Sequence, residues 1–318
     1  MQNVGLKIGN IFKSLGKNRK SSGKISQTPL YIMVLPAMII VFIYSYIPMV
    51  GIIIAFQDFI PAKGLFGNQT WVGLKNFLFL FQLPNTSSII WNTFYISIMK
   101  IISGLIFPVI VALLLNEIHH KRYKRTVQTL IYLPNFLSWV IFAGILVDIL
   151  SPGSGIVNKI LGLVGIKPIY FLGDPKWFPY TMVMTDLWKN FGFNTIVYLA
   201  AITNIDPTIY DAAYIDGANK WQQIIYVTIP GMSSIIILVA TLSLSNVLNA
   251  GFEQIFNMYS PQVYETGDII DTFVYRVGLI EARYSLATAV GTLKSLVSCL
   301  LISVSYYLAY KFADYRIF

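Results

Sequence analysis

Two apolar stretches of the sequence carry polar side chains at helical spacing. In residues 178–202 these are Asp186, Lys189, Asn190 and Asn194, and Tyr198 follows one turn later. Amide groups form hydrogen bonds with hydroxyl-rich ligands, and aromatic rings contact the apolar faces of sugar rings. Ionisable groups within apolar helices usually face a bundle interior or a water-filled cavity. We therefore expect these residues to line a path or cavity, and their mixed amide and aromatic character would suit a sugar.

A second polar stripe lies toward the end of residues 229–250. It consists of Ser245, Asn246 and Asn249. Together with the first stripe it predicts a mixed amide and aromatic lining. A lysine facing a path of low dielectric constant would favour an acidic sugar, although pairing of Lys189 with Asp186 at i, i+3 would weaken that effect. The alternative is that the ion pair and the amides only hold helices together.

Motifs for catalysis, phosphate binding or metal binding are not evident. Gly16 and Gly23-Lys24 are spaced wrongly for a phosphate loop, and Ile25 replaces the hydroxyl residue that this motif requires. Any ATP hydrolysis would therefore belong to another subunit. His119 and His120 are adjacent, a spacing that does not place both on one metal ion, so we expect no metal site and no catalytic residue.

The composition is that of an integral membrane protein. Of 318 residues, 56% are hydrophobic and 12% charged, with a mean hydropathy of +0.65. Soluble domains have about 25% charged residues. The net charge of +9 comes from bases beside apolar runs, which indicates membrane orientation and not nucleic-acid binding. The one cysteine, Cys299, excludes an internal disulfide and is expected to be a small packing residue.

Apolar runs long enough to cross a bilayer, which needs about 20 residues, predict an all-α protein with six transmembrane helices. The first run, residues 30–56, is kept as a span because it is too long for the core of a signal peptide. The predicted spans are residues 30–56, 89–115, 126–150, 178–202, 229–250 and 284–310. We expect residues 1–29 to form a basic cytoplasmic tail near anionic lipid and residues 311–318 a cytoplasmic C-terminal tail.

The distribution of lysine and arginine predicts the orientation of these spans. With both termini inside the cell, the cytoplasmic segments hold 13 lysine and arginine residues and the outer segments hold seven. Cytoplasmic segments of membrane proteins carry the excess of such residues. We therefore expect the loop that contains Lys220 to lie in the cytoplasm.

Residues 203–228 form the most distinctive segment of the chain. Asp206 followed by Pro207 predicts a helix start, because a carboxylate caps the first turn and proline needs no donor there. The helix should end near Asp216, where Gly217 can adopt the left-handed conformation. A second short helix should follow, and Pro230 is tolerated where the next helix begins. The small side chains of Ala212, Ala213 and Ala218 would allow a partner to approach closely, so we interpret the segment as a docking element.

This segment resembles the cytoplasmic loop of the permease subunits of bacterial binding-protein-dependent ABC importers. The family pattern is Glu-Ala-Ala, three residues, Gly, nine residues, then Ile-x-Leu-Pro. This chain keeps both spacings, with Asp211, Val227 and Ile229 in place of Glu, Ile and Leu. The resemblance is most specific for residues 89–310. The first span and the stretch YIPMVGIIIAFQDF resemble the branch that imports oligosaccharides, particularly uronic-acid and pectin-derived ones.

The resemblance implies a type I ABC importer fold of the MetI-like kind and a set of partners. These are a second, related permease, two ATP-binding cassette subunits that hold ATP and Mg²⁺, an extracellular solute-binding protein and an oligosaccharide. This chain itself would bind no cofactor. The ATPase-coupling residues would be Asp211, Ala212, Ala213, Gly217, Ala218 and Pro230.

Two other classes of function remain to be weighed against an importer. An ion channel would need a filter-like segment or a charged ring. A membrane-embedded enzyme acting on lipid-linked sugar would need a group of catalytic side chains. The sequence shows neither feature, and the docking element has no role in either class.

Overall fold

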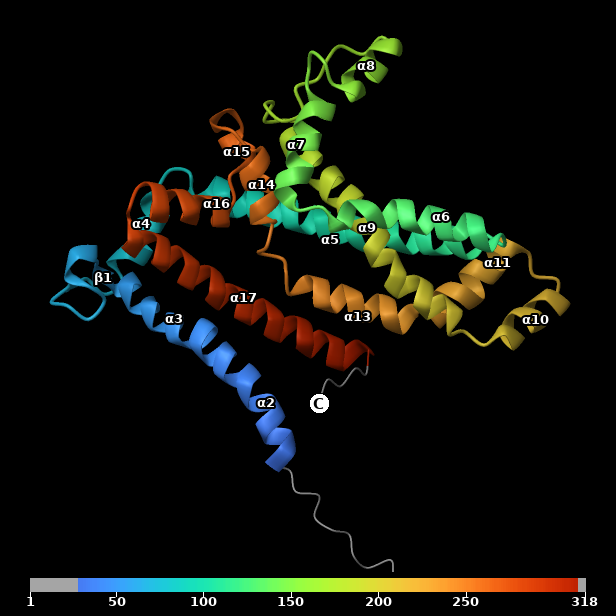
Figure 1. Cartoon of the computed structure of the whole chain (residues 1–318), viewed down its shortest axis with the longest axis horizontal. Helices are drawn as coiled ribbons and strands as arrows, with labels where there is room; N and C mark the ends of the chain where they lie inside the picture. The colour runs from blue at the N-terminus through green and yellow to red at the C-terminus, as the bar shows by residue number, and fades with distance from the viewer. Residues whose placement is uncertain (1–27, 314–318) are drawn as a thin grey trace, which may run out of the picture. The chain divides into compact units, whose positions relative to one another are not determined.

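The structure is a computed structural model that describes residues 28–313 (Figure 1). The predicted tails, residues 1–29 and 311–318, lie largely outside the described residues. The chain divides into two units, Met1–Gly51 and Ile52–Phe318. In the first, helix α2 (Thr28–Val41) continues through a π-helical turn (Phe42–Tyr46) into α3 (Ile47–Met49). The helical stretch Tyr31–Phe56 is long and apolar enough to cross a membrane, which supports the first predicted span.

The second unit begins with a small hairpin and a short helix. After a 3-10 turn (Val50–Phe56), strand β1 (Gln57–Asp58) pairs antiparallel with β2 (Thr70–Trp71), with Gln57 opposite Trp71. Helix α4 (Lys75–Gln82) follows. The Phe59 amide donates to Ser285 Oγ over 2.9 Å, which joins the hairpin to the start of the last helix.

Four helices form the frame of this unit: α5 (Thr86–Asn116), α9 (Phe178–Thr203), α13 (Ser233–Leu244) and α17 (Tyr284–Ala313). Helix α5 packs along α9, and α13 packs on α17 (Figure 1). A buried cluster of Ala112, Tyr198, Ile202 and Met232 joins α5 and α9 to the turn before α13. The frame therefore holds α9, which carries the first predicted polar stripe, whereas Ser245, Asn246 and Asn249 of the second stripe lie beyond the end of α13 and not on a helix.

Shorter helices fill the connections between the frame helices. Between α5 and α9 lie α6 (Lys121–Tyr132), α7 (Trp139–Leu150) and α8 (Ile156–Leu163). Between α9 and α13 lie α10 (Pro207–Ile215), α11 (Lys220–Gln223) and α12 (Ile229–Gly231). Between α13 and α17 lie α14 (Phe252–Met258), α15 (Tyr264–Gly267) and α16 (Ile270–Tyr275).

Two predicted spans are not single straight helices, and these two predictions were wrong in that respect. Residues 126–150 form most of α6, the 3-10 turn Leu133–Phe136 that contains Pro134, and α7, and the two arms are bent by 105° across Leu137 and Ser138. Proline lacks an amide donor and clashes with the preceding turn, so the α-helix ends at the 3-10 turn. Residues 229–250 break by 59° near Met232, and α13 ends at Leu244.

The number of spans can be judged by helix length and composition. Three described helical stretches are long and apolar enough to cross a membrane: Tyr31–Phe56, Thr86–Asn116 and Tyr284–Tyr307. The total is five if each bent pair counts as one span. Helix α9 has 26 residues but is not among them. The described residues thus support three to five spans, and the number six stays a prediction.

Candidate functional site

Helix α10 starts and ends where local sequence signals predict. A carboxylate oxygen of Asp206 accepts a hydrogen bond of 2.9 Å from the Thr208 amide, and Pro207 occupies the first position of the helix. This backbone hydrogen bond lowers the pKa of Asp206 below its ordinary value, because it stabilises the ionised form. The first turn of α10 is therefore capped by a charged group.

Gly217 follows the end of α10 and has a left-handed backbone conformation. Its φ is +81°, and its amide donates to the Tyr214 carbonyl over 3.0 Å. The Ala218 amide donates to the Ala213 carbonyl over 2.9 Å, so two carbonyls at the end of α10 are satisfied. The predicted helix and glycine turn are confirmed, and they fix the angle at which the chain enters α11.

Helix α11 is stabilised by signals that the sequence analysis missed. Asn219 and Gln222 form a reciprocal capping box, with bonds of 2.8 and 2.9 Å. The Tyr210 hydroxyl bonds that of Thr228 over 3.0 Å, which ties α10 to the π-helical turn Ile224–Thr228 that follows α11. The pattern Asn-x-x-Gln was visible in the sequence and could have predicted this second helix start.

The predicted coupling residues differ in their exposure. Asp211, Ala212, Gly217 and Pro230 are exposed, whereas Ala213 and Ala218 are half-buried. Helices α10 and α11 lie at the same end of the unit as the junction of α5 and α6 (Figure 1). The Lys220 ammonium lies 3.5 Å from the Glu117 carboxylate at that junction. An acidic residue and a small one are therefore presented on the outside of a short, well-capped helix.

Lys189 has a different environment from the one predicted for a path residue. Its side chain is buried, with the residue 5% exposed. The ammonium donates to the carbonyls of Pro134, Asn135 and Leu137 over 3.2, 2.9 and 2.6 Å. It also lies 5.4 Å from the centre of the Trp139 ring. All three donors of the ammonium are thus used by the bend between α6 and α7, and none is left for a ligand.

Asp186 pairs with Lys100 of α5, and among the described residues no ion pair joins it to Lys189, the alternative that their spacing had suggested. The Lys100 ammonium lies 3.7 Å from the Asp186 carboxylate and donates to the Ala250 carbonyl over 2.7 Å. It also donates to Gln254 Oε1, whose amide nitrogen in turn donates to the Met182 carbonyl over 2.8 Å. This network joins α5, α9 and α14.

Gly251 is required by the same network. It has a φ of +90°, and a Cβ atom there would lie 2.9 Å from the Lys100 ammonium nitrogen. The chain between α13 and α14, residues 245–251, therefore passes directly over the lysine. We call these residues the α13–α14 linker.

The other predicted path residues fall into two groups. Tyr198 is 1% exposed and lies in the buried cluster between α5 and α9, so it does not reach an open path. The Asn190 side chain accepts a hydrogen bond from Asn135 over 3.1 Å, and the Ser245 hydroxyl donates to the Leu242 carbonyl over 2.6 Å. The exposed members are Asn194, Asn246 and Asn249. These three amides are accessible to a ligand, although the Asn249 side-chain oxygen also accepts a long hydrogen bond of 3.4 Å from the Gly251 amide.

The side chains that could bind a metal ion do not gather in one place in the described part of the chain. Within the described part of the chain, no group of three or more His, Cys, Asp or Glu side chains could hold a metal ion.

Comparison with known proteins assigns the chain to a family. A family model described as "Binding-protein-dependent transport system inner membrane component" matches residues 104–315. The polygalacturonan/rhamnogalacturonan transport system permease protein YteP of Bacillus subtilis (strain 168) is 37% identical over 308 residues, covering 97% of this chain and 96% of that protein. Protein LplB of the same organism is 37% identical over 289 residues, or 91% of each chain.

A solved structure agrees with this assignment. It is that of a bacterial alginate ABC transporter in complex with an alginate pentasaccharide-bound periplasmic protein. One of its chains matches with a TM-score of 0.84 and 36% identity, covering 94% of this chain and 100% of that one. This chain therefore belongs to the family of inner-membrane components of binding-protein-dependent transport systems, the permeases of ABC importers.

Proposed function

We propose that this chain is the permease subunit of an ATP-driven importer that carries oligosaccharides through the plasma membrane of a bacterium. The observation that carries the proposal is the similarity, over nearly the whole chain, to permeases named for saccharides. The exposed amides of Asn194, Asn246 and Asn249 support it, because amides suit the hydroxyl groups of sugars.

The proposed substrate is an acidic oligosaccharide that contains uronate residues. The support is that the similar YteP is named for polygalacturonan and rhamnogalacturonan, and a similar structure belongs to an importer of the acidic polysaccharide alginate. The positive charge of Lys189 is not the basis for this preference, since its ammonium is saturated by backbone carbonyls.

The proposed partners follow from family membership. They are a second, related permease, two ATPase subunits that bind ATP and Mg²⁺, and an extracellular solute-binding protein. We propose that α10 with Gly217 docks on an ATPase subunit, with the Asp211 carboxylate meeting a basic group and Ala212 lying against its surface. The exposure of Asp211 and Ala212 supports this docking surface. Both termini and Lys220 would then lie in the cytoplasm.

The test is transport by the assembled complex in proteoliposomes that contain ATP and Mg²⁺. The complex is purified through a tag on this chain, and the solute-binding protein is added outside with radiolabelled trigalacturonate or an alginate trisaccharide. We expect ATP-dependent accumulation of at least one acidic sugar and little accumulation of neutral maltotriose. If an intact complex hydrolyses ATP but accumulates no saccharide, the proposed function is wrong. If maltotriose is accumulated equally well, only the preference for acidic sugars is wrong.

A further inference from the structure

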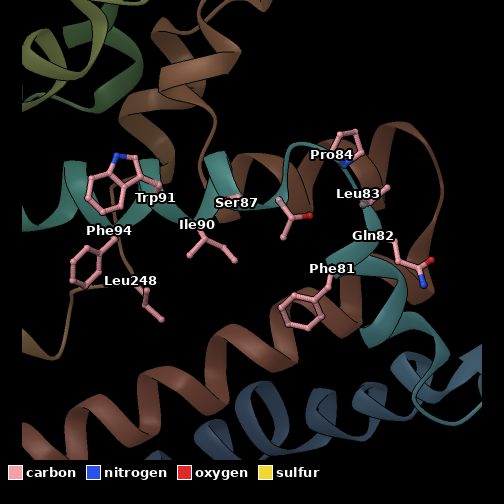
Figure 2. Close-up of a pocket in the computed structure, with 10 residues that line it drawn as sticks. Phe81, Gln82, Leu83, Pro84, Ser87, Ile90, Trp91, Phe94 and Leu248 are labelled. Atoms are coloured by element: carbon pink, nitrogen blue, oxygen red, sulfur yellow. The ribbon is translucent and has the colours of Figure 1, made fainter.

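A cavity of about 780 Å³ lies at the N-terminal end of α5, apart from the polar residues on α9. Its wall consists of the end of α4, the turn between α4 and α5, one face of α5, and Leu248 of the α13–α14 linker. Figure 2 shows Phe81, Ile90, Phe94 and Leu248 around this space. The volume falls within the range of about 300–1,000 Å³ that is typical of small-molecule sites.

Three aromatic side chains in this wall are exposed: Phe81, Trp91 and Phe94. Trp91 is supported from one side, because its ring stacks on Tyr95 with 6.3 Å between centroids and 24° between planes. Tyr95 in turn meets Tyr180 of α9 edge to face at 6.5 Å. The tryptophan therefore has a fixed support and an accessible surface, as a platform for an apolar ring face requires.

Two polar side chains in the same wall are available to a ligand. Gln82 and Ser87 are exposed, and neither side chain forms a hydrogen bond with another described residue. Thr86 differs, because its hydroxyl donates to the Leu80 carbonyl over 2.6 Å and closes the end of α4. An amide and a hydroxyl thus stand beside the aromatic surface, and both can bond ligand hydroxyls.

The turn between α4 and α5 argues against a lipid tail as the occupant of this cavity. The backbone is not helical at Leu83–Asn85, and exposed polar residues in and beside this turn include Gln82, Asn85, Ser87 and Ser88. Hydrocarbon cannot satisfy exposed backbone and amide groups, so lipid-exposed irregular turns do not occur at that depth. This end of the cavity must therefore meet water or polar ligand groups.

The cavity adjoins a packed core. Leu80, Ile89, Ile270 and Phe273 belong to one buried cluster and line a smaller neighbouring space, not the cavity itself. This apolar space of about 100 Å³ shares Ile90 and Leu248 with the cavity, and it is far smaller. The packed core holds the ends of α4 and α5 that carry the wall, so little order has to be created on binding.

The cavity also adjoins residues of the proposed path. Leu248 lies between Asn246 and Asn249 in the α13–α14 linker, and both amides are exposed. A sugar chain of several rings could therefore contact the aromatic wall with one ring and these amides with another.

We propose that this cavity is a saccharide subsite, in which Trp91 and Phe94 contact the apolar face of one sugar ring while Ser87 and Gln82, toward the α4 end of the wall, bond hydroxyls of the neighbouring part of the sugar chain (Figure 2). The proposal rests on the proposed function and adds to it a place where the substrate is held. It assigns to α5 a role in recognition in addition to its role in the frame.

The first test compares Trp91→Ala with Trp71→Ala in the reconstituted complex. Both tryptophans are 63% exposed, but Trp71 lies in the β-hairpin and not in the cavity wall. We expect Trp91→Ala to raise the KM for trigalacturonate uptake about threefold to tenfold, the loss typical of one aromatic contact. Trp91→Phe should recover part of that loss, and Trp71→Ala should behave as the unmodified protein. Equal KM values for both alanine variants would overturn the subsite.

The second test identifies what contacts the wall. A photoreactive benzoylphenylalanine replaces Trp91, and the complex is irradiated with the solute-binding protein loaded with radiolabelled trigalacturonate. Labelled sugar attached to this chain is the expected result. Crosslinking only to the second permease or only to lipid would overturn the subsite while transport by the unmodified complex still stands. Absence of saccharide transport by the unmodified complex would instead reject the proposed function and the subsite together.

Discussion

Lys189 places an ammonium group inside a 26-residue helix, where an unsatisfied charge is costly. Three backbone carbonyls at the bend between α6 and α7 accept hydrogen bonds from this lysine, and one of them, that of Pro134, also accepts from the Leu137 amide. The carbonyls at the bend gain a hydrogen-bond donor, and the buried ammonium gains acceptors. The residue therefore holds the bend and is not a free charge in a path.

We predict that Lys189→Met destabilises the protein. The methionine fills a similar volume but leaves the three carbonyls without this donor, at a cost of roughly 1–3 kcal/mol for each group that stays unsatisfied. Thermal unfolding of the purified complex in detergent should show a lower midpoint. Lys159→Met is the control, since Lys159 is exposed on α8.

One outcome of this experiment would show that Lys189 faces the substrate path after all. If Lys189→Met unfolds at the same temperature as the control but loses uptake of trigalacturonate and keeps uptake of a neutral sugar, the ammonium recognises the carboxylate of the substrate.

The sequence identified the chemical types at these positions but not their partners. Asp186 and Lys189 stand three residues apart, so a local ion pair was the natural expectation. The observed partners are far away along the chain: Lys100 for Asp186, and the residues around Pro134 for Lys189. Helix packing decides such partners, and helical periodicity alone does not describe it.

At the scale of elements, the segment from α10 to α11 was predicted well because its signals are local. Asp206, Pro207 and Gly217 each act within one turn of the chain. The broken helices were predicted poorly, because hydrophobic runs remain continuous through Pro134 and Gly231. A run of apolar residues shows that a segment can lie in a membrane, but the direction of its helix changes where proline or glycine interrupts the hydrogen bonds.

We predict that Gly217→Val impairs transport more than stability. A Cβ atom at Gly217 meets nothing within 4 Å, so the cost arises from the φ of +81° and not from a clash. A left-handed residue with a side chain costs about 1–2 kcal/mol, and relaxation of that strain would turn α11 relative to α10. We expect normal amounts in the membrane, reduced co-purification of the ATPase subunits, and uptake lowered at least tenfold.

Gly153→Val is the matched control for this change. Gly153 also meets nothing within 4 Å of an added Cβ, but its φ is not positive and it lies in the connection between α7 and α8. Full uptake and full co-purification in both variants would show that the turn at Gly217 is not needed for coupling.

At the scale of the whole molecule, the orientation in the membrane connects the two proposed sites. The α10–α11 segment can meet an ATPase only from the cytoplasm, while the cavity beside α4 can receive a saccharide from outside only if α5 starts on the outer side. Because α5 is one of the long apolar helices, its two ends can lie on opposite sides of the bilayer. The excess of lysine and arginine in the predicted inner segments favours this arrangement.

We predict that Asn68 faces the outside, whereas His119 and Lys220 face the cytoplasm. Since Cys299 is the one cysteine of the chain, Cys299→Ser gives a background without thiols for single Asn68→Cys, His119→Cys and Lys220→Cys variants. All three positions are exposed, so a membrane-impermeant maleimide can reach them from the side on which they lie.

In intact cells the maleimide should label Asn68→Cys alone, and permeabilisation of the cells should add labelling of His119→Cys. Lys220→Cys should react after removal of the ATPase subunits. His119→Cys provides an inner reporter away from α10, so labelling of both inner positions from outside would reverse the orientation and contradict docking of α10 on a cytoplasmic ATPase.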